Sequence, residues 1–285
     1  MLREIRELGF DRVELSHGTR ISLLPGIVEA VEAGEVTVSS LHNFCPLPIG
    51  VNGAAPNLYQ FSSENPRERD LALKHTLKTL EFAQRVHAQA VVLHLGSIDM
   101  KDPTDKCLEM VGRGERESPK YDRLLMEFVE KREARKEPFM ERMTAMLRTI
   151  AADAAARGLR LGAEIREGLT ELPIETDFQF LLRDVGNPAV GYWHDTGHAQ
   201  IKENLGLIRH AMHLESLRER LIGFHIHDVQ PPGRDHCAPG TGMIDYRALQ
   251  PFVRPEHIKV FELSPTAEFE DIRRGVAMIR ELWGE

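Results

Sequence analysis

The sequence predicts an α/β protein, a (β/α) barrel of the TIM type, and three observations support this fold. Short apolar runs rich in Val, Ile and Leu alternate with longer segments of helical periodicity. Several runs are apolar on both faces, which is typical of parallel strands covered by helices. The length of 285 residues suits one such barrel, which typically takes about 250 residues.

Seven segments are expected to form the strands of the barrel. They are residues 12–16, 36–44, 90–96, 159–165, 189–195, 221–228 and 257–263. A complete barrel has eight strands, and this chain opens on a helical pattern instead. The first strand is therefore expected to be missing or displaced at the N-terminus.

The helical segments carry recognisable ends. Asn65 is expected to cap a helix, with Pro66 in its first turn and Glu68 at the capping-box position. A second helical region, from about 121 to 157, should break near Pro138 and stop at Gly158.

We expect a single barrel domain, residues 1–285, with a charged helical insertion at residues 97–140. Residues 101–137 contain ten Lys or Arg and ten Asp or Glu. This balance favours a solvated helical excursion over a lid or a contact between subunits.

Composition narrows the class of protein. The formal net charge of −8 makes a nucleic-acid partner unfavourable, because such proteins usually carry a basic excess. No apolar run reaches membrane-spanning length, so no membrane partner is expected. The three cysteines, Cys45, Cys107 and Cys237, are sparse and odd in number, which indicates a cytoplasmic protein. Assembly into a homo-oligomer stays open.

Residues that can bind a metal stand at the end of nearly every expected strand. They are His42, His94, Glu164, Asp195, His198, His225, His227, Asp228, His236 and Glu262. The carboxyl ends of barrel strands converge on one face, where such barrels build their active sites. A lone histidine there is more often structural than a ligand. The set as a whole indicates a metal site, because clustered carboxylates repel each other without a cation.

Alternation along the strands separates neighbouring candidates. Asp195 shares a face with Trp193, so His194 points toward the helices and is expected to be structural. His225 and His227 share a face, and either could reach a metal.

In their order and spacing, the motifs "GAEI", "HDTGHA", "HIHD", "DHCAPGTGMID" and "FEL" resemble the xylose isomerase-like TIM-barrel superfamily. This superfamily contains sugar and sugar phosphate isomerases, epimerases and endonuclease IV. Its isomerases and epimerases imply a divalent metal held by Glu164, Asp195, His225 and Glu262. The resemblance prefers His225 to His227, because His225 matches the first position of the His-x-x-Asp pattern.

The same resemblance implies roles for four more histidines. His198 matches a zinc ligand of the nuclease branch and a substrate contact of the epimerase branch. His236, His42 and His94 match or lie near further nuclease ligands. The nuclease has an acid two residues before the histidine at 236, whereas this chain has Arg234 there and Asp235 next to the histidine.

These residues lead to one main hypothesis. We expect a metal-dependent isomerase or epimerase of a small sugar, sugar phosphate or polyol, with Mn, Zn, Mg or Co as the metal. Glu164 and Glu262 would be catalytic, one taking a proton from carbon and the other returning it. The expected substrate contacts are Arg166, His198, His227, Glu14, His17 and Glu167.

Two alternatives remain open at this stage. One is a zinc-dependent hydrolase of phosphoesters, similar to endonuclease IV and motivated by His42, His94, His198 and His236. The other is a barrel that binds a sugar or a metal without catalysis.

Overall fold

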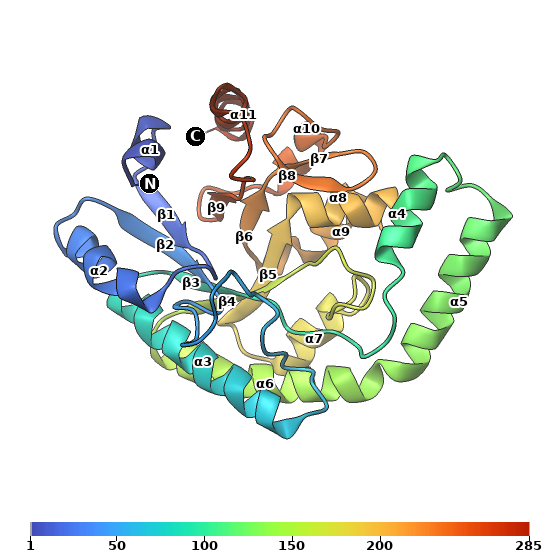
Figure 1. Cartoon of the computed structure of the whole chain (residues 1–285), viewed down its shortest axis with the longest axis horizontal. Helices are drawn as coiled ribbons and strands as arrows, with labels where there is room; N and C mark the ends of the chain where they lie inside the picture. Colours follow the sequence, from blue (N-terminus) through green and yellow to red (C-terminus); the bar gives the residue numbers. More distant parts are fainter. Residues whose placement is uncertain (1, 285) are drawn as a thin grey trace. The chain divides into compact units, whose positions relative to one another are not determined.

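The structure is a computed structural model that describes residues 2–284 (Figure 1). Its main sheet has seven strands in the order β1-β2-β3-β4-β5-β6-β9. These are β1 (Arg12–Leu15), β2 (Thr37–His42), β3 (Ala90–Leu93), β4 (Arg160–Glu164), β5 (Val190–Asp195), β6 (Leu221–Ile226) and β9 (Ile258–Phe261). The strands run parallel, and helices separate them along the chain, which confirms the predicted (β/α) barrel class. Helix α1 (Leu2–Glu7) precedes β1.

Further helices and one hairpin complete the described chain. The helices are η1 (Ile21–Leu23), α2 (Leu24–Glu32), α3 (Pro66–Arg85), α4 (Thr104–Gly112), α5 (Pro119–Arg135), α6 (Glu137–Ala156), α7 (Phe178–Val185), α8 (Thr196–Asn204), α9 (His210–Leu217), η2 (Arg218–Arg220), α10 (Tyr246–Leu249), η3 (Gln250–Phe252) and α11 (Phe269–Trp283). Strands β7 (Asp228–Gln230) and β8 (Arg234–Cys237) form an antiparallel pair. Within residues 2–284, no helix is both long enough and apolar enough to cross a membrane.

Two compact units divide these elements. Unit 1 comprises residues 2–97, 139–164 and 180–191, and unit 2 comprises residues 98–138, 165–179 and 192–284. Unit 1 holds β1 to β4, whereas unit 2 holds most of β5 together with β6 to β9. Each unit draws on segments that are far apart in the sequence.

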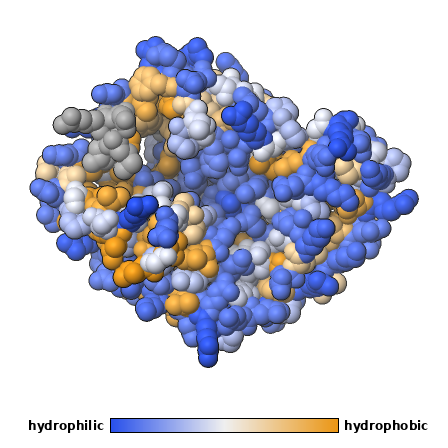
Figure 2. Space-filling model, viewed as in Figure 1, coloured by the Kyte–Doolittle hydropathy of each residue, from blue (hydrophilic) through white to orange (hydrophobic). Residues whose placement is uncertain are grey.

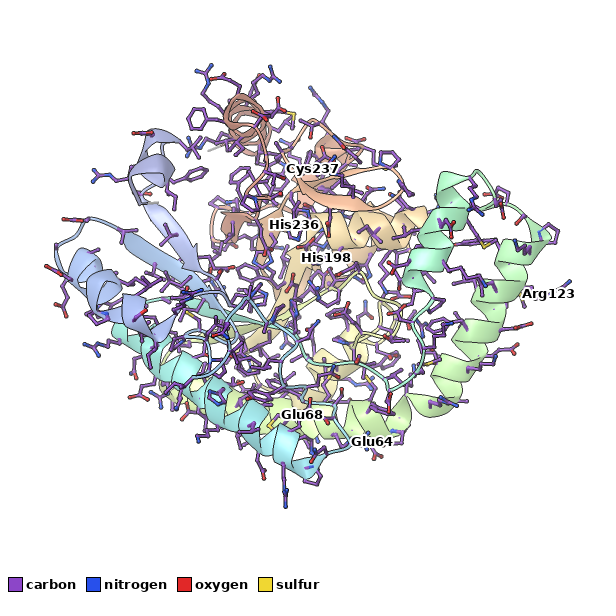
Figure 3. All side chains as sticks on the ribbon, viewed as in Figure 1. Glu64, Glu68, Arg123, His198, His236 and Cys237 are labelled. Carbon is purple, nitrogen blue, oxygen red and sulfur yellow. The ribbon has the colours of Figure 1, made fainter. Side chains whose placement is uncertain are left out.

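In unit 1, the helix ends form largely where the sequence places them. The side chain of Asn65 caps α3 by accepting the Arg67 amide at 3.0 Å, and Pro66 opens the helix. Glu68 instead accepts the Gln60 amide at 2.9 Å, so its carboxylate fixes the preceding loop. Figure 3 shows Glu68 at this end of α3.

Helix α3 also fixes the end of β2. Thr76 and Thr79 of α3 each bond the side-chain amide of Asn43 at 2.9 Å. All three residues are buried, and a buried amide needs such partners. Asn43 follows His42, so α3 holds the backbone at the carboxyl end of the strand.

Exposed apolar side chains lie on the segments that follow β1 and β2 in unit 1. Ile21, Leu23 and Ile49 are exposed there, and Figure 2 shows orange side chains in the part of the face where Figure 1 draws α2. The loops that follow β1 and β2 are joined by a hydrogen bond from the Leu47 amide to the Thr19 carbonyl at 2.8 Å. They therefore present a single surface.

In unit 2, the predicted break near Pro138 falls between α5 and α6, with Pro138 in the first turn of α6. Proline fits that turn because its missing N–H has no partner there. Figure 3 shows Arg123 on α5 pointing away from the helix. On another side of α5, Tyr121 is buried and donates to the Leu205 carbonyl at 2.8 Å.

A buried group of ions ties α5 to the segment after β4. The Lys202 ammonium lies 3.4 Å from one oxygen of Glu175, and Arg132 lies 3.8 Å from the other. Lys202 also donates to the Gly168 carbonyl, and Arg132 to the Leu169 carbonyl. Burial alone raises the pKa of Glu175, but the two cations outweigh it and hold that pKa below its ordinary value. The network fixes residues 168–175.

A directed chain of hydrogen bonds lies behind β5. The Tyr192 hydroxyl is 2.8 Å from His194 Nδ1, and His194 Nε2 is 2.9 Å from His210 Nε2. His210 Nδ1 faces the side-chain oxygen of Gln200 at 3.3 Å. That oxygen only accepts, so each residue donates to the next and both rings can stay neutral. His194 is buried here among α8 and α9, as its predicted structural role requires.

Burial lowers the pKa of His210 to about 3 and the pKa of the nearby His213 to about 4. Below a pH of about 6.5, these two rings are protonated in the unfolded chain but stay neutral in the folded protein. We therefore expect the free energy of unfolding to fall as the pH drops. Between pH 7.5 and pH 5, each ring should cost about 2 kcal/mol of unfolding free energy.

Urea denaturation across this pH range measures the effect. Burial also lowers the pKa of His194 well below its ordinary value, so the variant His213→Leu should lose about a third of the pH dependence. His87→Asn, at an exposed position, should keep the wild-type dependence. Equal pH dependence in wild type and His213→Leu would contradict this account.

Candidate metal centre

Strand register in unit 2 brings three predicted ligands together. Asp195 pairs with His225 across β5 and β6, and the neighbouring pair is Ile226 with Phe261 of β9. Glu262 follows Phe261 directly, and its amide bonds the Ile226 carbonyl. Three neighbouring strands therefore carry Asp195, His225 and Glu262 at or next to their last residues.

The side chains of these residues converge. His225 Nδ1 lies 3.0 Å from a Glu262 oxygen and 3.7 Å from an Asp195 oxygen. Asp195 and His225 are fully buried, whereas the Glu262 side chain is 30% exposed. An imidazole nitrogen between two carboxylates matches the donor set of a divalent cation. Glu262 is therefore the member of the group that is accessible to solvent.

Asp195 is fixed from two further directions. One oxygen accepts the His198 amide at 2.7 Å and so caps α8, where the positive end of the helix dipole favours a carboxylate. The other oxygen lies 2.9 Å from His227 Nε2. A buried charge requires such donors.

A second group of side chains that could bind a metal lies in unit 1, at the ends of β2, β3 and β4. One donor atom from each of His42, His94 and Glu164 lies within 4.8 Å of the others, and all three residues are buried. His42 Nε2 lies 3.3 Å from a Glu164 oxygen, and His94 Nε2 lies 2.9 Å from the same oxygen.

Outer partners set the protons of these two rings. His42 Nδ1 faces the Asn43 carbonyl at 2.9 Å, and His94 Nδ1 faces the side-chain oxygen of Asn57 at 2.8 Å. Both oxygens accept, so both Nδ1 atoms donate, and in neutral rings the Nε2 lone pairs point at the Glu164 carboxylate. Lone pairs facing a carboxylate need a proton or a cation between them, and histidine ligands of metals are held in this way.

The segment after β4 covers His198. His198 Nδ1 faces the Ile165 carbonyl at 3.1 Å, and its Nε2 lies 3.2 Å from both Arg166 and Glu167. The Arg166 guanidinium pairs with Glu167 at 3.0 Å and with Glu171 at 3.3 Å. Arg166, Glu167 and His198, three of the expected substrate contacts, thus form one polar cluster.

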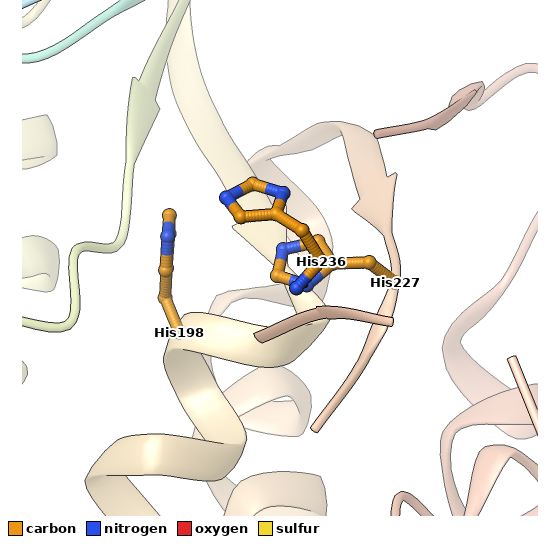
Figure 4. A group of neighbouring side chains, drawn as sticks. All are labelled: His198, His227 and His236. Atoms are coloured by element: carbon orange, nitrogen blue, oxygen red, sulfur yellow. The ribbon is translucent and has the colours of Figure 1, made fainter. Parts of the chain in front are cut away.

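His236 faces this cluster from β8 (Figure 4). Figures 3 and 4 show it near His198, and Figure 3 shows Cys237 beyond it. The Asp235 carboxylate lies 3.8 Å from His236 Nε2 and 3.9 Å from His198 Nε2. Although Arg234 takes the place of the nuclease acid, Asp235 therefore brings a carboxylate near both histidines.

Two expected substrate contacts lie in unit 1. Glu14 accepts the Ser40 hydroxyl at 2.7 Å. The ring of His17 lies 4.7 Å from that of His42, edge to face. His17 thus stands beside the second group of side chains.

Asp228 holds the loop that follows β8. Its two oxygens accept the amides of Val229, Gly240, Gly242 and Ile244 at 2.8–3.1 Å. A Cβ at position 242 would lie 2.4 Å from the carboxylate, so the "PGTG" turn needs glycine there. This buried carboxylate organises the loop, a role that the sequence pattern did not indicate.

Comparison with known proteins defines the family. Residues 2–282 match the family described as "Xylose isomerase-like TIM barrel". The chain belongs to this family. A search of curated proteins found no matching sequence.

Several solved structures share the fold. A D-tagatose 3-epimerase-like protein is 18% identical with a TM-score of 0.70, covering 99% of this chain and 91% of that chain. The 3-keto-D-glucoside 4-epimerase of E. coli is 17% identical with a TM-score of 0.69, covering 98% and 92%. A putative xylose isomerase of Rhodospirillum rubrum is 17% identical with a TM-score of 0.70, covering 99% and 92%. At these identities the likeness shows the barrel fold alone.

Proposed function

We propose that this family member is a divalent-metal-dependent isomerase or epimerase of a small sugar, sugar phosphate or polyol. The observation that carries the proposal is the convergence of Asp195, His225 and the partly exposed Glu262 at three neighbouring strand ends. Epimerases among the structural neighbours support the reaction class.

Four residues would hold the cation in this proposal. Asp195, His225 and Glu262 contribute from unit 2, and Glu164, at the end of β4, is the fourth ligand expected from the sequence. Strand β4 is the neighbour of β5 in the sheet order, which supports this assignment. Oxygen-rich donors with one imidazole suit Mn or Mg, while Zn and Co also accept this set.

A bound divalent cation would stabilise the negative charge that develops on neighbouring sugar oxygens when a carbon-bound proton leaves. One of Glu164 and Glu262 takes that proton, and the other returns it. Arg166, Glu167 and His198 orient the substrate hydroxyls through the polar cluster described above. Return of the proton to the opposite face of the carbon inverts its configuration. Return to the adjacent carbon, with the hydroxyl proton moving to the former carbonyl oxygen, isomerises the sugar.

Replacing Glu262 by glutamine should lower exchange of the carbon-bound proton with deuterated water by at least about 100-fold, because glutamine cannot accept a proton. Exchange is measured by NMR on Mn-loaded protein with a panel of ketoses and their phosphates. Glu256→Gln, at an exposed position, is the matched control and should exchange like the wild type. Wild-type exchange in Glu262→Gln would contradict the proposal.

A second function, hydrolysis of a phosphoester by a zinc site with two or three metals, is favoured by two specific observations. His42 and His94 direct their Nε2 atoms at Glu164, and Asp235 approaches both His198 and His236. Two or three metals could thus stabilise the attacking and leaving oxygens of a displacement. A barrel that binds a sugar or a metal without turnover is the third alternative.

Metal stoichiometry separates the two enzyme functions. The isomerase proposal predicts one tightly bound equivalent per chain by mass spectrometry under native conditions, unchanged in His94→Gln. The hydrolase function requires two or three equivalents, one of which His94→Gln would remove. A count of two or three in the wild type, together with phosphodiesterase activity, would replace the isomerase proposal.

A further inference from the structure

We propose that His227 is a positioning residue rather than a contact to substrate. It fixes the orientation of the Asp195 carboxylate and the backbone conformation of His236. This inference rests on the proposed metal site, because Asp195 is one of its ligands.

Both ring nitrogens of His227 are engaged within the protein. Nδ1 accepts the backbone N–H of His236 at 2.9 Å, so Nδ1 carries no proton. In the neutral ring the proton is therefore on Nε2, which lies 2.8 Å and 2.9 Å from the two oxygens of Asp195. Because His227 is fully buried, these two bonds define its environment.

The first turn of α8 packs against His227 and fixes its position. Thr196 Oγ donates to the His227 carbonyl at 2.8 Å and lies 3.1 Å from the His227 amide, which clamps its backbone. A Cβ on Gly197 would lie 2.1 Å from the ring. The absence of a side chain at Gly197 thus leaves the space that the His227 imidazole occupies.

His227 also supports an unfavourable backbone conformation. His236 has a φ of +52°, in the left-handed region that costs a non-glycine residue about 1 kcal/mol. Its ring stacks on that of His227, with centroids 4.3 Å apart and planes 16° apart. His236 Nδ1 in turn faces the Glu262 carbonyl at 3.0 Å. Through His236, the same imidazole reaches the backbone of a second proposed ligand.

Two substitutions separate the two bonds. The amide oxygen of asparagine stands near the position of Nδ1 and can accept the His236 N–H, but it cannot reach Asp195. The amide nitrogen of glutamine stands near the position of Nε2 and can donate to Asp195, while its acceptor no longer faces His236.

The test measures binding of Mn²⁺ alone by calorimetry and exchange of the His236 amide by mass spectrometry. His227→Asn should weaken Mn²⁺ binding about 10- to 100-fold, as loss of an outer partner of a metal ligand does. It should retain slow exchange at His236. His227→Gln should bind Mn²⁺ within about threefold of wild type and exchange the His236 amide faster.

Two further variants guard against a general loss of folding. Gly197→Ala displaces the ring without removing it and should weaken Mn²⁺ binding as His227→Asn does. His213→Gln removes a buried imidazole elsewhere in unit 2 and should leave both readouts unchanged.

Wild-type Mn²⁺ affinity in His227→Asn and Gly197→Ala would overturn the inference while leaving the proposed function intact. Failure of the wild type to bind Mn²⁺ would overturn the proposed function. In that case the His236 amide still decides the positioning role, because equal exchange in His227→Asn and His227→Gln would refute it.

Discussion

A buried carboxylate at the end of β5, that of Asp195, is the constraint on which the candidate site depends. It accepts the His198 amide in the first turn of α8 and the Nε2–H of His227, and it faces His225 across the parallel pairing. Taking a carboxylate out of water is costly unless charge and hydrogen bonds compensate it. The elements around Asp195 supply that compensation, and in doing so they fix the start of α8, the end of β6 and the strained backbone at His236.

Two chemically different sets of donors follow from this arrangement of strand ends. The set in unit 2 is rich in oxygen and includes the partly exposed Glu262, which suits a cation that shares its coordination with substrate. The set in unit 1 pairs two imidazoles with one buried carboxylate, which suits zinc in a closed environment. The first set supports the isomerase proposal, and the second supports the alternative hydrolase function.

The outer partners show how the fold directs this chemistry. Asn43 is fixed by two threonines of α3 and fixes the ring of His42. The ions around Glu175 hold residues 168–175, which begin two residues after Arg166. The contacts of Asn43 join α3 to His42, so this proposed ligand has a defined tautomer and orientation.

The sequence predicted the barrel class, seven strands and the residues at their ends, because buried parallel strands are apolar and their polar ends stand out. Strand lengths were overestimated: the run 36–44 extends past the end of β2 at His42. The Asn43 amide still bonds the Val92 carbonyl of β3, but the Asn43 side chain bonds α3. The β7–β8 pair was not predicted, nor was the role of the Asp228 carboxylate in the loop that follows it. Asn57 was also missed, since its contact with His94 spans 37 residues.

Alternation placed His225 and His227 on one face and so left either as a ligand. Strand β6 ends at Ile226, and beyond that residue alternation no longer determines direction. The structure turns His227 toward Asp195 and the His236 amide, a geometry that depends on the space left by Gly197. The alternation of residues along one strand does not predict a contact between separate elements.

The central claim is that Asp195, His225 and Glu262 hold the catalytic cation. Crystals grown with Mn²⁺ and measured at the manganese absorption edge test it most directly. The account predicts an anomalous peak about 2.0–2.4 Å from a donor atom of each of these three residues. Absence of that peak, with anomalous density only beside His42 and His94, would contradict it.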